Sequence, residues 1–251
     1  KTFAGVENLY TRMERMATLN PIFVDITWGA GGVTEELSTT IADYAQKFLG
    51  VDVLLHITCT NLTKDLLKNI LENVKSLGIR NILAVRGDPP KGALKWTPIH
   101  GGCQNAKELV QFIREEFGDY FGVAVAGFPE GHPDSNRNGS GSYDEYILHL
   151  KEKVDAGADF IMTQFFYDAN KFVHFLKKCR EAGITCPIIP GIMPIHSYSF
   201  FQKMTKFAGT CVPHSIWTDL APLRDDDEAV KAYGKYYRWY IFVMLYSLTY
   251  Y

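Results

Sequence analysis

The chain has 251 residues, 47% of them hydrophobic, and its 26 basic and 28 acidic side chains give a formal net charge of -2. This length and apolar content suffice for a single compact domain over residues 1–251. The balanced charge excludes the basic surface that nucleic acid or an anionic membrane requires. We therefore expect small molecules or like subunits as partners.

Five cysteines are present, in no CxxC pair and at no zinc-binding spacing, which predicts a reducing, cytoplasmic compartment and no metal site. The Asn-x-Ser/Thr triplets at Asn61 and Asn138 are then interpreted as chance matches to a glycosylation pattern. No signal peptide opens the sequence, and the uncharged run from Trp239 to Tyr251 is shorter than the roughly 18 to 20 apolar residues that span a bilayer. We expect no membrane anchor.

Predicted helices and strands alternate along the chain, beginning with a helix over residues 5–19. Six runs rich in Val, Ile and Phe are continuously apolar, as is typical of buried parallel strands. These strands are predicted over residues 21–29, 51–60, 81–88, 122–129, 159–166 and 186–194. Helical periodicity predicts helices over residues 34–49, 63–78, 104–117, 143–156, 169–182 and 197–207.

The helix predicted over residues 63–78 shows the pattern most clearly. Its apolar stripe is expected to contain Leu66, Ile70, Val74 and Leu77, with lysines and acids elsewhere. Gly78 stands where a glycine commonly ends a helix.

A strand and a helix recur roughly every 25 to 40 residues, which favours an α/β fold of the (β/α)8 TIM-barrel type. The doubly wound alternative is less favoured because no G-x-G-x-x-G follows any strand. A helix precedes the six clear strands. We therefore expect the barrel's first strand to be missing from this chain and its last strand to be obscure.

Polar and aromatic side chains collect where the predicted strands end, which is the catalytic face of such a barrel. Each one alone has a structural alternative: a core histidine, a glutamine that caps backbone groups, or a structural ion pair between Arg86 and Asp88. Their occurrence at the same end of successive strands favours a binding site. The residues are Thr27, Trp28, His56, Thr58, Arg86, Asp88, Phe128, His132 and Gln164.

The tripeptide Arg86-Gly87-Asp88 ends a buried strand and is followed by Pro89 and Pro90. A surface adhesion loop would be exposed and flexible, so we interpret the tripeptide as part of the site instead. A glycine between the two charges would let a flat ligand approach the backbone closely. This predicts an aromatic ring system across the barrel mouth.

A loop rich in small residues, 131–142, leads into a helix that carries His149, Lys151 and Lys153. Loop amides and these basic side chains are suited to holding phosphates. The alternative is a plain flexible connection followed by a solvated helix face.

Together these segments closely resemble the catalytic domain of methylenetetrahydrofolate reductases of the eukaryotic type, from Lys1 to about Gly234. The strings that carry the resemblance are DITWGAGG, LLHITCTN, NILAVRGDPP, AVAGFPEGHP, KEKVDAGADFIMTQFFYD and CPIIPGIMPI. The resemblance implies a cytoplasmic, homodimeric flavoprotein oxidoreductase of one-carbon metabolism and methionine biosynthesis. In it, NAD(P)H, with NADPH favoured, reduces FAD, and 5,10-methylenetetrahydrofolate is then reduced to 5-methyltetrahydrofolate in a ping-pong scheme.

The same resemblance implies roles for particular residues. Asp88 would act in catalysis by steadying charge on the folate, and Gln164, Asp88 and Thr27 would contact the substrates. The implied FAD contacts are Thr27, Trp28, Ala30, His56, Arg86, Gly87, Asp88, Ala106, Phe128, His132, Ser135 and Lys153.

The sequence also departs from the family pattern. Phe128 replaces a tyrosine of bacterial relatives, and Tyr146 replaces an acidic residue on the adenosine side. The family's general-acid glutamate would lie upstream of Lys1, so no proton donor is named here. Residues 235–251 (KYYRWYIFVMLYSLTYY) replace the usual last helix and strand, and the regulatory domain of eukaryotic members is not found.

Two other functions remain open at this point. One is a non-catalytic folate- or flavin-binding barrel, which the missing general acid would favour. The other is a flavin oxidoreductase resembling proline dehydrogenase.

Overall fold

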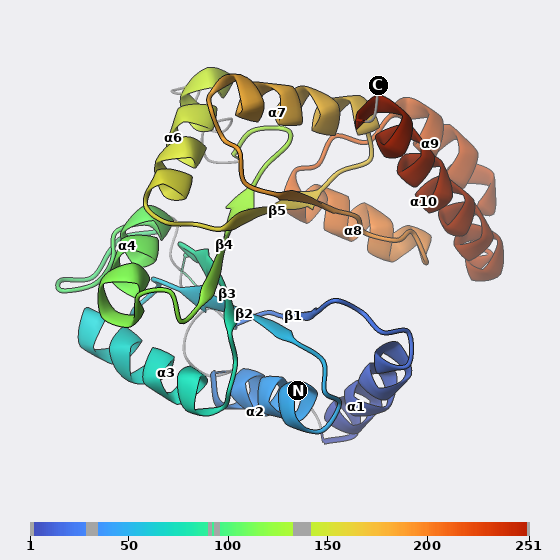
Figure 1. The fold of residues 1–251 in the computed structure, drawn as a ribbon. Coiled ribbons are helices and arrows are strands. Elements are labelled where there is room, and N and C mark those ends of the chain that lie inside the picture. Colours follow the sequence, from blue (N-terminus) through green and yellow to red (C-terminus); the bar gives the residue numbers. More distant parts are fainter. Residues whose placement is uncertain (1–2, 29–34, 90–91, 93–95, 133–141, 250–251) are drawn as a thin grey trace. The chain divides into compact units, whose positions relative to one another are not determined.

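The computed structural model describes residues 3–28, 35–89, 92, 96–132 and 142–249. The chain divides into two compact units, Lys1–Val125 with Asp155–Asp159 and Ala126–Val154 with Phe160–Tyr251. Strands and helices alternate in both units (Figure 1). This alternation confirms the expected α/β class.

The first unit is built on parallel strands that pair in chain order, each with the next. The register pairs Ile26 with Leu55 and Leu55 with Ile82, so neighbouring strands end close together. The strands are β1 (Val24–Ile26), β2 (Val53–Thr58), β3 (Asn81–Val85) and β4 (Gly122–Gly127), of which β4 continues into the second unit. The helices are α1 (Phe3–Ala17), α2 (Glu35–Lys47), α3 (Lys64–Ser76) and α4 (Ala106–Phe117).

Strands β2 and β3 of the first unit are buried on both faces, whereas Asp25 in β1 is exposed. Leu54 and Leu55 point to opposite faces of β2, yet both are fully buried. Figure 1 shows α2 and α3 along one side of β1, β2 and β3. Helical cover on a parallel sheet explains why these strands are continuously apolar and do not alternate.

Helix α3 corrects one sequence-based expectation. Its buried residues are Leu67, Leu71 and Val74, which are spaced i, i+4 and i+7, whereas Leu66 is 49% exposed. The stripe is therefore shifted by one residue from the one predicted through Leu66 and Ile70. The predicted pair, Leu66 and Ile70, and the buried pair, Leu67 and Leu71, both fit helical spacing. Only the contact with the rest of the protein decides which pair is buried.

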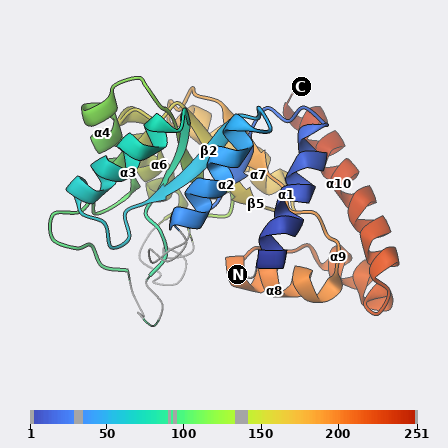
Figure 2. The same ribbon diagram turned by 90° about the horizontal axis from the view of Figure 1, so that it is seen from below.

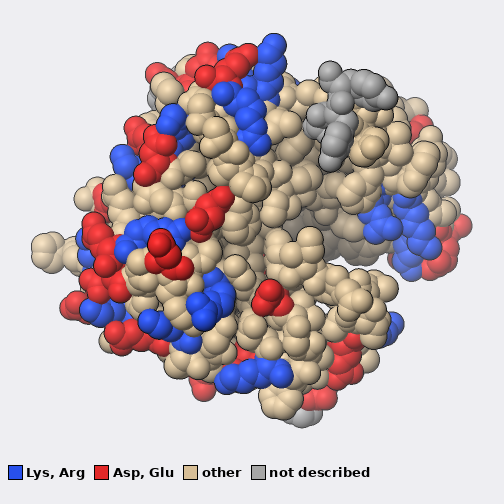
Figure 3. All heavy atoms as spheres, viewed as in Figure 1, with Lys and Arg blue, Asp and Glu red and all other residues tan. Residues whose placement is uncertain are grey.

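The outer surface of α3 and α4 carries acidic and basic side chains in close mixture, as the face in Figure 3 shows. An ion pair joins the two helices, with Lys68 Nζ 2.6 Å from Glu116 Oε2. The mixture agrees with the balanced charge of the sequence.

The second unit contains two parallel strands, with a register irregularity between Met162 and Phe165. Two apolar clusters form its core, one around Phe201 and Ile216 and the other around Phe166 and Ile241. In Figure 2, α8, α9 and α10 lie together. The elements are α6 (Tyr143–Asp155), β5 (Phe160–Phe165), α7 (Ala169–Glu181), β6 (Ile188–Gly191), α8 (Tyr198–Ala208), α9 (His214–Leu220), the short 3-10 helix η1 (Ala221–Leu223) and α10 (Asp227–Thr249).

The aromatic tail is helical. Helix α10 begins at the acids, where Asp226 Oδ1 accepts the N–H groups of Glu228 and Ala229 at 3.0 and 3.1 Å, and it continues to Thr249. Ile241 and Leu245 bury one side of the helix against α7, whereas several aromatic side chains of the tail are exposed.

Six strands occur in the described residues. The α/β alternation is thus confirmed. The eight-stranded closure and the single-domain organisation stay predictions.

Candidate active site

The ends of β1 and β2 bring a histidine and an aspartate together. His56 Nε2 lies 2.7 Å from Asp25 Oδ1 across the two strands, although the N–H direction does not give a hydrogen bond. Thr27 is exposed at the end of β1, and its carbonyl accepts a hydrogen bond from Ser38 Oγ at 3.0 Å. Trp28 is buried, with 8% of its surface exposed. His56 therefore faces a carboxylate and is not an isolated core histidine.

The turn after β3 is fixed by one hydroxyl group. Thr60 Oγ1 lies 3.2 Å from both the Arg86 and the Asp88 carbonyl oxygens, to which it donates, and it accepts the Trp96 indole N–H at 2.9 Å. The Arg86 guanidinium lies over the Trp96 ring, 5.5 Å from its centroid. Asp88 is exposed, and in the described part of the chain no hydrogen bond or ion pair to its carboxylate is found. This carboxylate is available to a ligand.

The structure gives a different explanation for the glycine at position 87 from the one expected. Its φ is +88°, and a Cβ at this position would lie 2.3 Å from Thr60 Oγ1 and 3.0 Å from Thr58 Cβ. The side chains of β2 and the turn after it therefore already fill the space beside Gly87. The packing of the protein itself thus accounts for the glycine, and the close approach of a flat ligand to its backbone stays a prediction.

Ala106 is the first residue of α4 and is 8% exposed. Asn105 caps this helix by accepting the Glu108 N–H at 3.0 Å, and its carbonyl oxygen accepts the Cys59 thiol at 3.4 Å. The cap ties the start of α4 to the segment after β2. Ala106 thus belongs to the same unit as the ends of β1, β2 and β3.

In the second unit, β4 ends in a group of aromatic rings. The Phe128 and His132 rings meet edge to face, with 4.7 Å between centroids. Tyr146, which is 5% exposed, accepts the Phe128 N–H through its hydroxyl oxygen at 2.5 Å, and the Tyr143 hydroxyl donates to the Pro129 carbonyl at 2.9 Å. Tyr146 therefore supports the backbone at the end of β4, a role that its expected position opposite an adenosine did not suggest.

Glu130 follows in the same loop. Its Oε2 accepts the Cys211 N–H at 2.7 Å, and burial raises the pKa of its carboxyl group, although that N–H and Lys171 act in the opposite direction. The loop after β4 is thus tied to the segment that precedes α9.

Two further predicted site residues lie in this unit. Lys153 on α6 donates to the Ala126 carbonyl at 3.4 Å, which points its ammonium group toward β4. Gln164 lies in β5, and its Oε1 accepts the N–H of the next residue, Phe165, at 3.0 Å. Gln164 is half-buried, and this local bond fixes its amide group.

The predicted site residues thus fall into two groups. The first unit brings together Thr27, Trp28, His56, Arg86, Gly87, Asp88 and Ala106, and the second contains Phe128, His132, Lys153 and Gln164. Ala30 and Ser135, also predicted as FAD contacts, lie outside the described residues.

Three residues that contact members of the first group were not singled out from the sequence: Asp25, Thr60 and Trp96. A charged residue inside an apolar strand was a usable signal for Asp25. Nothing in the local sequence indicates that the Thr60 hydroxyl reaches the turn after β3, because that contact spans residues far apart in the chain.

The fold and these side chains define an α/β protein whose polar residues gather at the carboxyl ends of parallel strands, where such folds bind their ligands. The chain belongs to the methylenetetrahydrofolate reductase family, whose model matches residues 1–243. The match thus reaches into the aromatic tail, beyond the limit near Gly234 expected from the sequence.

Sequence relatives agree with this assignment. "Methylenetetrahydrofolate reductase (NADH) 1" of Zea mays is 50% identical over 238 residues, which cover 93% of this chain and 40% of the maize protein. "Probable methylenetetrahydrofolate reductase (NADPH)" of Caenorhabditis elegans is 42% identical over 237 residues, covering 92% of this chain and 34% of that protein. The chain therefore spans about two fifths of the length of the maize relative.

A solved structure of an uncharacterized protein from Clostridium thermocellum, which binds two copies of 5-methyl-5,6,7,8-tetrahydrofolic acid, has the same fold. Its TM-score is 0.51 at 14% identity, covering 94% of this chain and 87% of that one.

None of the described helices is long and apolar enough to cross a membrane. Nor do the described His, Cys, Asp and Glu side chains form a group of three or more that could hold a metal ion.

Proposed function

We propose that this chain is the catalytic part of an FAD-dependent reductase that converts 5,10-methylenetetrahydrofolate to 5-methyltetrahydrofolate with NAD(P)H. The observation that carries the proposal is the group at the ends of β1, β2 and β3. There the His56–Asp25 pair joins β1 and β2, and the Arg86 guanidinium and the exposed Asp88 carboxylate follow β3, the next strand of the same sheet. Membership in the reductase family supplies the reaction.

The chemistry of these side chains fits a flavin. His56 Nε2 is buried and faces the Asp25 carboxylate at 2.7 Å, so the pair would act on a flavin together. Arg86 offers a planar cation in the same unit. Trp28 in that unit, and Phe128, His132 and Lys153 in the second unit, are further FAD contacts that the family resemblance implies.

When bound, FAD would supply the two-electron hydride chemistry that links the nicotinamide to the methylene carbon of the folate. The folate also takes up one proton on N10, as the bond from N10 to that carbon breaks. Asp88 would stabilise the positive charge that develops on the folate, because a carboxylate at the reacting ring lowers the energy of a cation. Gln164 would orient folate and nicotinamide in turn through its amide group.

The nicotinamide preference is a separate proposal. The family resemblance favoured NADPH, whereas the maize relative is named as an NADH enzyme and the nematode relative as an NADPH enzyme. We retain NADPH as the prediction. The preference is tested by the rates of flavin reduction at equal concentrations of NADPH and NADH. Faster reduction by NADH would contradict the prediction.

The finer structural expectations belong to the same proposal. A closed eight-stranded barrel, a homodimer and a cytoplasmic location in methionine biosynthesis are what the family resemblance implies for the whole protein. Sedimentation of the purified protein tests the dimer directly.

The experiment that tests the function uses the visible spectrum of the purified chain after incubation with FAD. Addition of NADPH or NADH without oxygen should bleach the flavin band, and 5,10-methylenetetrahydrofolate should restore it. Restoration by a quinone but not by the folate would indicate a different flavin oxidoreductase. A chain that binds FAD but is not reduced would indicate a non-catalytic binding protein, and a chain that retains no FAD would contradict the proposal.

A further inference from the structure

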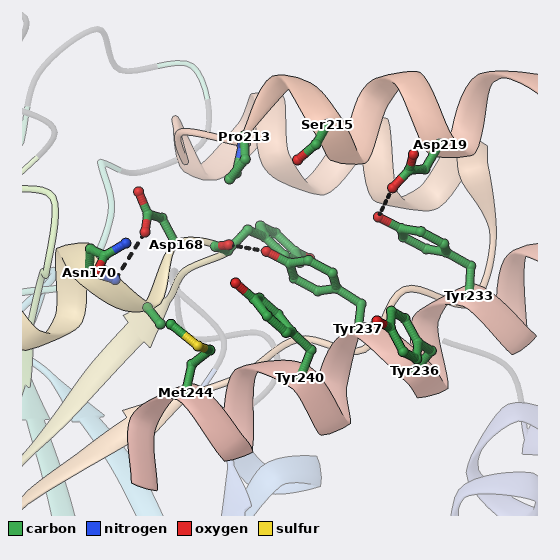
Figure 4. Close-up of a pocket in the computed structure, with 12 residues that line it drawn as sticks. Asp168, Asn170, Pro213, Ser215, Asp219, Tyr233, Tyr236, Tyr237, Tyr240 and Met244 are labelled. Atoms are coloured by element: carbon green, nitrogen blue, oxygen red, sulfur yellow. Dashed lines mark hydrogen bonds between the residues drawn. The ribbon is translucent and has the colours of Figure 1, made fainter. Parts of the chain in front are cut away.

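One face of α10 carries four tyrosines that line a hollow of about 380 Å³ in the second unit. Tyr233, Tyr236, Tyr237 and Tyr240 are spaced i, i+3, i+4 and i+7, which places them on the same side of the helix. In Figure 4, Tyr233, Tyr237 and Tyr240 extend from α10 toward α9 and the start of α7. Pockets for small ligands begin at about 300 Å³, so this one suits a small molecule.

The tyrosine rings are held in a fixed arrangement. Tyr233 and Tyr237 stack with 6.0 Å between centroids and 14° between planes, and Tyr240 is 5.7 Å from Tyr237 at 42°. The Tyr237 hydroxyl donates to the Tyr167 carbonyl, and the Tyr233 hydroxyl donates to Asp219 Oδ2 at 3.1 Å. These two bonds hold the Tyr233 and Tyr237 rings in place beside the pocket.

Two carboxylates stand at the same pocket. Asp219 on α9 uses one oxygen for Tyr233, and Asp168 before α7 uses Oδ1 for the Asn170 N–H at 2.9 Å. The pocket lining contains no lysine or arginine, and neither carboxylate has an ion pair within the described part of the chain. Negative charge and the electron-rich faces of aromatic rings therefore meet without a cation of the protein to balance them.

From this arrangement we infer that the pocket binds a small organic cation of the quaternary ammonium class. Such cations bind to the faces of tyrosine and tryptophan rings, and they carry no N–H groups that require hydrogen-bond partners. An anion would be repelled by Asp168 and Asp219. A metal ion such as Ca²⁺ takes six to eight oxygen ligands, which two carboxylates do not provide.

The inference goes beyond the proposed reductase activity and does not depend on it. Tyr236, Tyr237 and Tyr240 belong to the aromatic tail, into which the family match reaches as far as residue 243.

Choline is the probe for a binding test by isothermal titration or by ligand-detected NMR with the purified chain. The control ligand is 3,3-dimethyl-1-butanol, which has the same shape without the charge. We expect choline to bind with a Kd on the order of 1 mM and the neutral alcohol to bind at least about tenfold more weakly. Absence of choline binding, or equal binding of the two compounds, would overturn the inference.

Matched variants assign binding to this pocket. Asp219→Asn keeps an acceptor for Tyr233 but removes a charge, and Tyr240→Leu removes a ring that is 41% exposed. Each should weaken choline binding about fivefold. Trp239→Leu changes an aromatic residue of the same helix that is 65% exposed and lies outside the lining, and its binding should stay within about twofold of wild type.

If the Asp219→Asn and Tyr240→Leu variants bound choline as the wild type does, the pocket would not be the site. Flavin content is measured in parallel, so a failure of the reductase proposal is seen separately. Should Tyr240→Leu fail to fold, Asp219→Asn alone decides, because it preserves the shape of the pocket.

Discussion

Gly87→Ala tests whether the turn after β3 has no space for a side chain at position 87. The new Cβ would lie 2.3 Å from Thr60 Oγ1, and the residue would keep a φ of +88°. The left-handed backbone costs a non-glycine residue about 1 kcal/mol, and forcing atoms into a filled space costs about 1–3 kcal/mol more. We therefore expect the free energy of unfolding to fall by roughly 2–4 kcal/mol.

The matched control is Gly78→Ala at the end of α3. Gly78 has a similar φ of +81°, but nothing lies within 4 Å of the position that a Cβ would take. This variant should lose only the backbone contribution, about 1 kcal/mol. The difference between the two variants isolates the clash with Thr60.

Thermal unfolding of the two variants and the wild type is the assay. For a chain of this size, 1 kcal/mol lowers Tm by about 2–4 °C. Gly87→Ala should lower Tm by about 5–10 °C and Gly78→Ala by about 2–4 °C. Equal losses in the two variants would refute the packing argument for Gly87.

Four further predictions concern single residues. Asp88→Asn should slow flavin reoxidation by the folate about 100-fold in stopped-flow measurements, and unchanged rates in both half-reactions would rule out its assigned role. Gln164→Ala should raise the Kd for folate without loss of FAD, so loss of FAD would show that the residue is misplaced. Burial raises the pKa of Glu130 from its ordinary value of 4.5, so the folded protein binds this proton more tightly and loses that stabilisation as the pH rises. The Tm of Glu130→Gln relative to wild type should therefore increase from about pH 4.5 to about pH 7.5, and a constant difference would contradict the assignment. Iodoacetamide should alkylate the exposed Cys211 before Cys179, whose pKa is raised to about 12 by burial, as peptide mass spectrometry of timed samples would show.

The helices and strands were largely predictable because each has a strong local signal. The run NILAVRGD was predicted as a strand over residues 81–88, and β3 spans Asn81–Val85. The helix predicted over residues 169–182 is α7, Ala169–Glu181. Continuous apolar runs and helical periodicity are properties of the local sequence, so they can be read without knowing the neighbours.

The structure differs from the expectations where a distant part of the chain decides the outcome. Leu66 and Leu67 both fit a helical stripe, and the sheet beneath α3 selects Leu67. The reason for Gly87 depends on Thr60, which is 27 residues away in the sequence and belongs to another turn. Tyr146 bonds to the Phe128 backbone across a loop. Contacts of this kind have no local pattern.

Part of the candidate site was predictable because it also depends on the local sequence. That Thr27, His56, Arg86 and Asp88 follow successive strands is visible in the sequence. The partner of His56 is not, because the pairing with Asp25 depends on the register between β1 and β2.

The Thr60 hydroxyl has a consequence for how this protein can change over time. The chain leaves the sheet after Val85, and the Asp88 carbonyl and the Trp96 indole N–H are both bonded to the same Thr60 oxygen atom. Insertions or deletions between these two points would leave the entry and the exit of the segment fixed. Related proteins can therefore differ in length there while the spacing of β3 and α4 is preserved.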